Sequence, residues 1–102
     1  MSILHTVNKS PFERNSLEAC VRLAAKGGTV LMIEDGVYGA MKGTIKSDMV
    51  INAMKDLTFC VLGPDLKARG VDEAKLIEGV KVVEYSDFVN LTVENDKAQA
   101  WL

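Results

Sequence analysis

A chain of 102 residues is long enough for one hydrophobic core and too short for two, so we expect a single domain spanning residues 1–102. Its 48% hydrophobic and 25% charged composition is typical of a soluble globular protein. A net charge of −2, with acids and bases interleaved, gives no reason to expect direct binding to nucleic acid or anionic lipid. We see neither a secretion signal nor an apolar run of the roughly 20 residues that cross a bilayer. These features predict a cytoplasmic protein without a membrane partner.

In chain order, four short segments rich in apolar and β-branched residues are predicted to be strands, each followed by turn-forming residues. They are Ile3–Val7, Thr29–Ile33, Thr58–Leu62 and Val80–Tyr85. Apolar residues at helical spacing predict helices between them and after the last strand. These helices are Ser16–Lys26, Ser47–Leu57 and a final one from about Asp87 towards Lys97, whereas Gly36–Lys46 is expected to be a loop or a short helix.

Strands and helices alternate, and at least two strands are continuous apolar runs, which is the pattern of a parallel sheet buried on both faces. We therefore predict an α/β fold, a small three-layer α/β/α domain with a mainly parallel sheet. Ligands of such sheets gather at the carboxyl ends of the strands. That edge would bring together Lys9, Ser10, Glu34, Asp35, Asp65 and Asp87. Helix capping by Asp65 and Asp87, and the ordinary polarity of loops, also explain these residues.

The sequence lacks the residues that several kinds of functional site require. A zinc site needs about four ligands at suitable spacing, and this chain has one histidine and two distant cysteines. Glycine-rich phosphate-binding motifs and a GxSxG nucleophile motif do not occur. His5 lies inside the first predicted strand and is expected to be a packed residue rather than a base. We therefore expect no metal and no nucleotide or organic cofactor.

The two cysteines remain as candidates for chemistry. Cys60 lies in the middle of a predicted strand, where a cysteine acts as a small apolar side chain. Cys20 lies beside Leu17 and Ala24 on the helical wheel, at the flank of the apolar stripe. From the residues alone it is either a packed side chain or a nucleophilic thiol that needs a positive environment. These two interpretations of Cys20 stay open at this point.

Five stretches of the chain resemble one known family. "LHTVNKSPFERNSLEAC", "EDGVYGA", "VLGPDLKARG", "YSDFVNLTVE" and the terminal "AWL" are similar to the DsrH/TusB family of sulfur-relay proteins, in register over nearly the whole chain. The resemblance implies a DsrE/F/H-like α/β fold. It also implies a subunit of a heterohexamer, a dimer of heterotrimers formed with DsrE-like and DsrF-like subunits. In that DsrEFH-type complex, sulfur moves as a persulfide between cysteines towards a DsrC/TusE-like acceptor.

The resemblance also bears on Cys20, because the DsrH-type cysteine of the family falls on it, within "NSLEAC". Members of the TusB branch commonly lack a cysteine at this place, so its presence favours the sulfur-oxidation branch. A thiolate there would attack the outer sulfur of a donor persulfide, and access and ionisation would control the rate. Such a Cys20 would open onto a subunit boundary rather than the core. Cys60 matches no motif of the family.

Three functions follow as hypotheses. The first is a sulfur-carrier or transferase subunit in sulfur oxidation, which is not an enzyme on its own, with Cys20 as the catalytic thiol, reactive and reachable by solvent. The second is a structural subunit without transfer chemistry, which keeps exposed apolar residues such as Met41, Ile45 or Trp101. The third is a TusB-type role in 2-thiolation of the tRNA wobble uridine. A homo-oligomer of the isolated chain stays open under all three.

Overall fold

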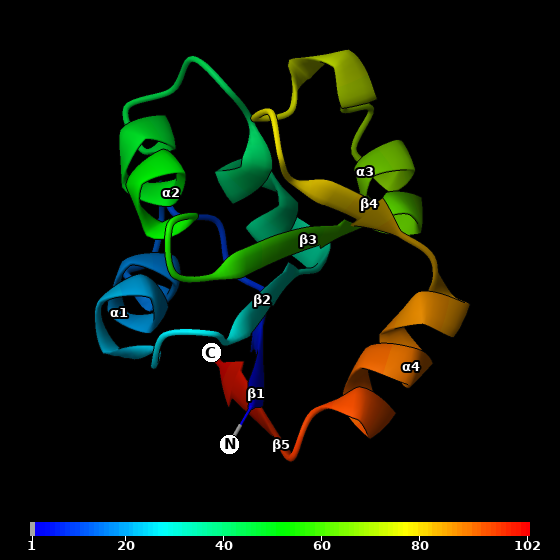
Figure 1. Cartoon of the computed structure of the whole chain (residues 1–102). Helices are drawn as coiled ribbons and strands as arrows, with labels where there is room; N and C mark the ends of the chain where they lie inside the picture. Colours follow the sequence, from blue (N-terminus) through cyan, green and yellow to red (C-terminus); the bar gives the residue numbers. More distant parts are fainter. Residues whose placement is uncertain (1) are drawn as a thin grey trace.

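A parallel sheet of five strands forms the centre of the computed structural model, which describes residues 2–102 (Figure 1). In chain order the strands are β1 (Ile3–Val7), β2 (Thr29–Met32), β3 (Thr58–Leu62), β4 (Lys81–Val83) and β5 (Lys97–Trp101). Their order in the sheet is β4-β3-β2-β1-β5, and every neighbouring pair is parallel. The first strand of the chain is therefore an interior strand, and the last one forms an edge.

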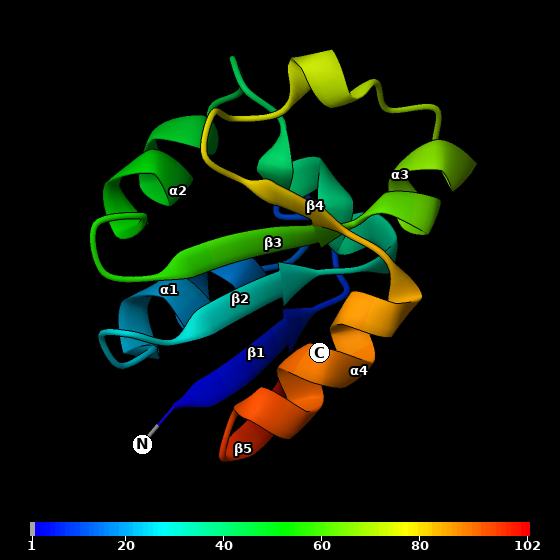
Figure 2. The same cartoon turned by 45° about the vertical axis from the view of Figure 1, so that its right-hand side comes forward.

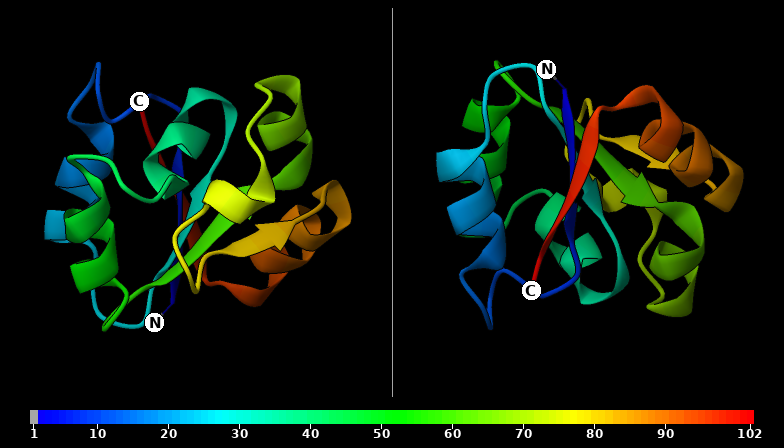
Figure 3. Two further views of the ribbon diagram at one scale, coloured as in Figure 1. Left: turned by 90° about the horizontal axis from the view of Figure 1, so that it is seen from above. Right: turned by 90° about the horizontal axis from the view of Figure 1, so that it is seen from below.

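Helices cover both faces of this sheet. They are α1 (Ser16–Leu23), the 3-10 helix η1 (Glu34–Ala40), α2 (Ser47–Ala53), α3 (Gly63–Ala68), the 3-10 helix η2 (Glu73–Lys75) and α4 (Tyr85–Glu94). Helices α1 and α2 lie side by side on one face, and α4 lies on the opposite face (Figures 2 and 3). The predicted three-layer α/β/α fold with a parallel sheet is confirmed. Among the helices of residues 2–102, none has the length and apolar character needed to cross a membrane.

The hydrophobic core is divided unequally between the two faces. Alternate side chains of the central strands, including Val30 and Phe59, enter a large cluster together with residues of α1, α2, α3 and η1. On the other face, Leu4, Leu31 and Cys60 form a small cluster that is packed against side chains of α4. One face is therefore covered by several elements, and the other is covered chiefly by a single helix.

The fifth strand was absent from the four-strand prediction, which extended the final helix to Lys97. The structure ends α4 at Glu94 and pairs β5 with β1 over five residues. Most of β5 is exposed, so its sequence, KAQAW, carries no buried alternation. Two hydrogen bonds join Asp96 to Ser2 and fix the register of the strand. The backbone N–H of Asp96 donates to the Ser2 carbonyl at 3.0 Å, and the Asp96 carboxylate accepts from the Ser2 N–H at 2.9 Å. Pairing with β1 rather than local pattern makes it a strand.

The remaining predicted elements exist, with shifts at their ends. Strands β1 and β3 have the predicted bounds, whereas α1 and α2 end three and four residues early. Ala24 has an extended backbone (ψ 135°), which ends α1 before the predicted end of the helix at Lys26. Gly63-Pro64-Asp65, the turn-forming residues after the third predicted strand, open the helix α3. Proline suits the first helical turn, because the N–H it lacks has no partner there.

A hydrogen bond between the only histidine and the only tryptophan joins β5 to the interior strand β1. Trp101 Nε1 donates to His5 Nδ1 at 3.0 Å, and His5 is 2% exposed. Burial lowers the pKa of His5, so the imidazole is neutral at pH 7. Because Nδ1 accepts, the ring proton lies on Nε2. The expected role of His5 as a packed strand residue agrees with this arrangement.

We predict that Trp101→Phe lowers the free energy of unfolding by about 1–2 kcal/mol, because the phenyl ring keeps much of the burial and loses the donor. The variant leaves the buried His5 Nδ1 without its partner. Chemical denaturation followed by circular dichroism measures the loss. Gln99→Ala, at an exposed position of the same strand, is the matched control and should change stability by less than about 0.5 kcal/mol. Equal losses in the two variants would contradict a specific role of the hydrogen bond.

Candidate functional site

The structure places the predicted catalytic thiol, Cys20, inside the core. Cys20 is the fifth residue of α1 and is 0% exposed, as a member of the large cluster that also holds Val7, Leu17 and Val30. The helical wheel places Cys20 at the flank of the apolar stripe of α1. In the structure, this side of the helix packs against the core between the sheet and its helical layer. The prediction that Cys20 is reachable by solvent is therefore wrong for the chain by itself.

Burial also controls the ionisation of this thiol. Removal from water raises the pKa of Cys20 to about 12, because a thiolate is disfavoured among apolar side chains. At pH 7, only about one molecule in 100,000 would then carry the thiolate, which is the nucleophilic form. The basic residues nearest to α1 in the preceding loop, Lys9 and Arg14, are exposed at the surface. Neither is a cause of the shift in the pKa of Cys20.

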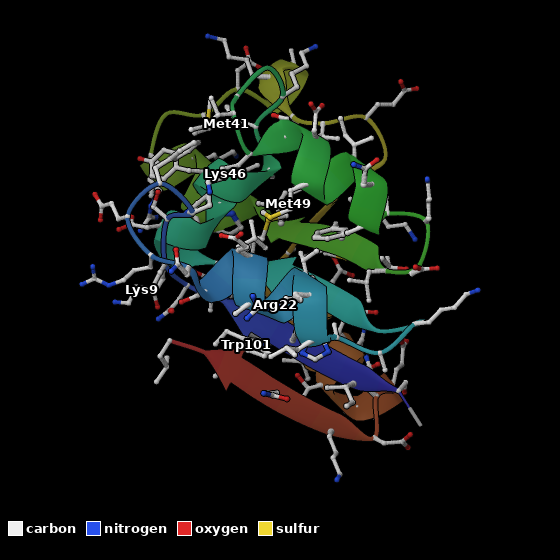
Figure 4. The ribbon with its side chains drawn as sticks, turned by 90° about the vertical axis from the view of Figure 1, so that its left-hand side faces the viewer. Lys9, Arg22, Met41, Lys46, Met49 and Trp101 are labelled. Atoms are coloured by element: carbon white, nitrogen blue, oxygen red, sulfur yellow. The ribbon has the colours of Figure 1, made fainter. Side chains whose placement is uncertain are left out.

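The surface above Cys20 is formed by α1 and its two neighbours. Figure 4 shows α1 between α2, which carries Met49, and β5, which carries Trp101. A groove of about 400 Å³ runs between α1 and α2 and is lined by Val21 and Ala24, the neighbours of Cys20 in the helix. Lys26 and Asp56, also in its lining, form an ion pair at 3.8 Å. A reagent could reach Cys20 from this side only if α1 moved away from α2.

The carboxyl edge of the sheet brings together part of the predicted polar set. Asp65, in α3, accepts a hydrogen bond from the backbone N–H of Glu34 at 2.7 Å, and Glu34 has the left-handed φ of 49°. Asp35 pairs with Arg69 at 2.9 Å, and Arg69 also donates to the Asp65 carbonyl at 3.3 Å. These contacts fasten the end of β2 to α3. Sequence analysis did not identify Arg69, because only the fold brings it to Asp35.

The other predicted edge residues stay in their own turns. Asp87 caps α4 by accepting from the backbone N–H of Glu84 at 2.9 Å, as the capping interpretation expects. Ser10 accepts from the backbone N–H of Phe12 at 3.2 Å, and Lys9 is exposed. Within the described residues 2–102, no three His, Cys, Asp or Glu side chains are grouped to hold a metal ion. Asp87 therefore caps its helix as expected, whereas Asp65 does not cap α3 and instead accepts from Glu34. The six polar residues do not converge on one site.

Cys60 has different surroundings on the opposite face. It is 3% exposed, and it packs in the small cluster beneath α4 with Leu31. Burial raises the pKa of Cys60, Lys81 acts against that shift, and Asp87 adds to it. Charged groups of β4 and α4 therefore influence Cys60, whereas Cys20 responds to desolvation alone.

Known proteins resemble this chain over its whole length. A family model described as "DsrH like protein" matches residues 9–98. The protein named TusB of Erwinia tasmaniensis is 39% identical over 99 residues, which cover 97% of this chain and 100% of that protein. TusB of Escherichia coli strain K12 is 32% identical with the same coverage. The crystal structure of the YchN protein from E. coli superposes with a TM-score of 0.86 at 19% identity, covering 98% of each chain, and so shows the fold alone.

These matches confirm the resemblance that the sequence motifs indicate. The fold and the full-length relatives define a small α/β protein of the sulfur-relay class. Within that class, the chain belongs to the DsrH-like family.

We predict that the stabilising effect of Cys20 is lost at alkaline pH. The unfolded thiol ionises near pH 8.5, whereas in the folded chain burial raises the pKa of Cys20 to about 12. Between these values the unfolded state releases a proton that the folded state keeps, so stability falls by about 1.4 kcal/mol per pH unit. The difference in unfolding free energy between wild type and Cys20→Ala should therefore shrink by about 2 kcal/mol from pH 8.5 to 10.5.

Denaturant titrations under reducing conditions at both pH values test this prediction. Val21→Ala alters the same helix without removing a titratable group, so its difference from wild type should stay constant with pH. If the difference in unfolding free energy between wild type and Cys20→Ala were also constant with pH, the Cys20 thiol would ionise in the folded chain and be open to water.

Proposed function

We propose that this chain is a TusB-type subunit of a sulfur-relay complex that serves 2-thiolation of the tRNA wobble uridine. In this role the chain contributes structure to the complex, and the sulfur passes through cysteines of its partners. The observation that carries the proposal is the complete burial of Cys20 together with the raised pKa of its thiol. The full-length relatives named TusB support the tRNA branch over the sulfur-oxidation branch.

Exposed apolar side chains support a role in an assembly. Tyr85, Val89 and Val93 recur every four residues on α4 and lie on its exposed side. Ile45, one of the residues expected to stay exposed in a subunit, is 88% exposed, whereas Met41 and Trp101 are half-buried. An apolar stripe on a surface helix suits burial against another protein. The partners in this proposal are the DsrE-like and DsrF-like subunits of a cytoplasmic heterohexamer, with a DsrC/TusE-like protein as the acceptor.

A second candidate function keeps Cys20 as a persulfide carrier in a DsrEFH-type complex for sulfur oxidation. It is favoured by the cysteine within "NSLEAC", where the family places its DsrH-type cysteine. In this case, partner binding would have to move α1 until Cys20 Sγ met the donor persulfide. The two candidates therefore differ in whether Cys20 is needed once the complex has assembled.

Deletion of the gene in its own host, followed by mass spectrometry of digested tRNA, tests the proposal. We expect 2-thiouridine to fall to background and to return fully with the wild-type chain or with Cys20→Ala. Val89→Asp places a carboxylate in the apolar stripe and should fail to restore the nucleoside, because a buried unpaired charge opposes assembly. Asn90→Asp, at the next position of α4, adds the same charge outside the stripe and serves as its control.

The outcomes separate the candidates. Unchanged 2-thiouridine after the deletion would overturn the tRNA role. Loss of sulfur oxidation in the deleted strain, without rescue by Cys20→Ala, would support the persulfide-carrier candidate instead. Genes for dissimilatory sulfite reductase beside this gene would point the same way, and an isolated TusBCD-like cluster would point to tRNA thiolation.

A further inference from the structure

A groove of about 510 Å³ lies between α4 and the strands β3 and β4, on the face opposite α1 and α2. Its strand side presents Thr58, Cys60 and Lys81, because these residues point to the face that α4 covers. Its helix side presents Asp87, Asn90 and Glu94, which are spaced about one turn apart on α4. The lining of the groove thus contains a thiol, an ammonium group, two carboxylates, an amide and two hydroxyl groups.

Cys60 is the cysteine that borders this space. Its register partner on β4 is Lys81, and both residues line the groove. Cys20, in contrast, borders neither this groove nor the one between α1 and α2. The chain therefore offers a small reagent one thiol at the side of a charged groove and one thiol enclosed in the core.

The charges of the groove select a type of ligand. Lys81 can hold a carboxylate, and the carboxylates of Asp87 and Glu94 can hold an ammonium group on the opposite side. A small amino acid presents both groups at once, and it fits within about 510 Å³. A dianion would meet two carboxylates, and a dication would leave Lys81 without a partner.

We propose that this groove binds a low-molecular-weight amino-acid disulfide and that Cys60 forms a mixed disulfide with it. The Cys60 thiolate attacks one sulfur, and a new S–S bond forms between Cys60 and half of the molecule. The original S–S bond breaks, and the other half leaves as a thiolate that takes up the proton released by Cys60. One disulfide is consumed and one is formed, so no further oxidant is needed. This site is independent of the function proposed above.

The test is the rate of adduct formation in the intact chain, followed by peptide mass spectrometry with cystine as the probe. We expect the cysteine adduct on Cys60 at least about tenfold faster than on Cys20, because thiol access controls the reaction. Cys60→Ser should abolish the fast adduct, and Cys20→Ser should retain it. A fast adduct on Cys20, or equal rates on both thiols, would overturn the proposal.

Recognition by charge is tested with two further disulfides and two further variants. Cystine should react faster than cystamine, which lacks carboxylates, and faster than dithiodiglycolate, which lacks ammonium groups. Lys81→Gln should lower the ratio of the cystine rate to the cystamine rate about threefold, the size of a partly exposed ion pair. Lys97→Gln, on β5 outside the groove, should leave the ratio unchanged. An unchanged ratio in Lys81→Gln, or a dianion that reacts as fast as cystine, would overturn the proposed ligand class.

Discussion

The burial of both faces of β1, β2 and β3 is the constraint on which the rest of the structure depends. A parallel sheet needs cover on each side, because its alternate side chains are apolar on both. Here α1, α2 and η1 cover one face, while α4 alone lies over the small cluster on the other. The first arrangement leaves Cys20 without exposed surface, and the second leaves a groove beside α4. Both features of functional interest thus follow from how the sheet is covered.

The same constraint separates the two thiols chemically. Both cysteines are buried, and burial raises the pKa of each thiol. Cys20 has only apolar neighbours in its cluster, so nothing offsets the cost of its ionisation. Cys60 has Lys81 as its register partner, and that charge opposes the shift. Burial thus raises the pKa of both thiols, and the face of the sheet decides whether charged groups such as Lys81 and Asp87 also act on that pKa.

Local sequence patterns were sufficient to predict the fold class. They were insufficient to predict the contacts that surround the two cysteines and the charged residues. The bounds of β1 and β3 followed from apolar runs and turn residues, which are local signals. Strand β5 is a strand because it pairs with β1, and Arg69 reaches Asp35 because α3 packs beside the end of β2. The helical wheel placed Cys20 on a flank, and only the packing of α1 decides that this flank is closed. The groove beside Cys60 likewise requires residues of β3, β4 and α4 to meet.

Helix α4 links the two surfaces that the proposals use. Its inner side packs Phe88 and Leu91 against the cluster that contains Cys60, and its outer side carries the stripe with Val89. Because α4 packs on the sheet through this small cluster, a shift of the helix would change the width of the groove. A partner bound to that stripe would restrain α4 and keep the groove narrow. Assembly of the relay complex would therefore slow disulfide exchange at Cys60, although the partner never touches the thiol.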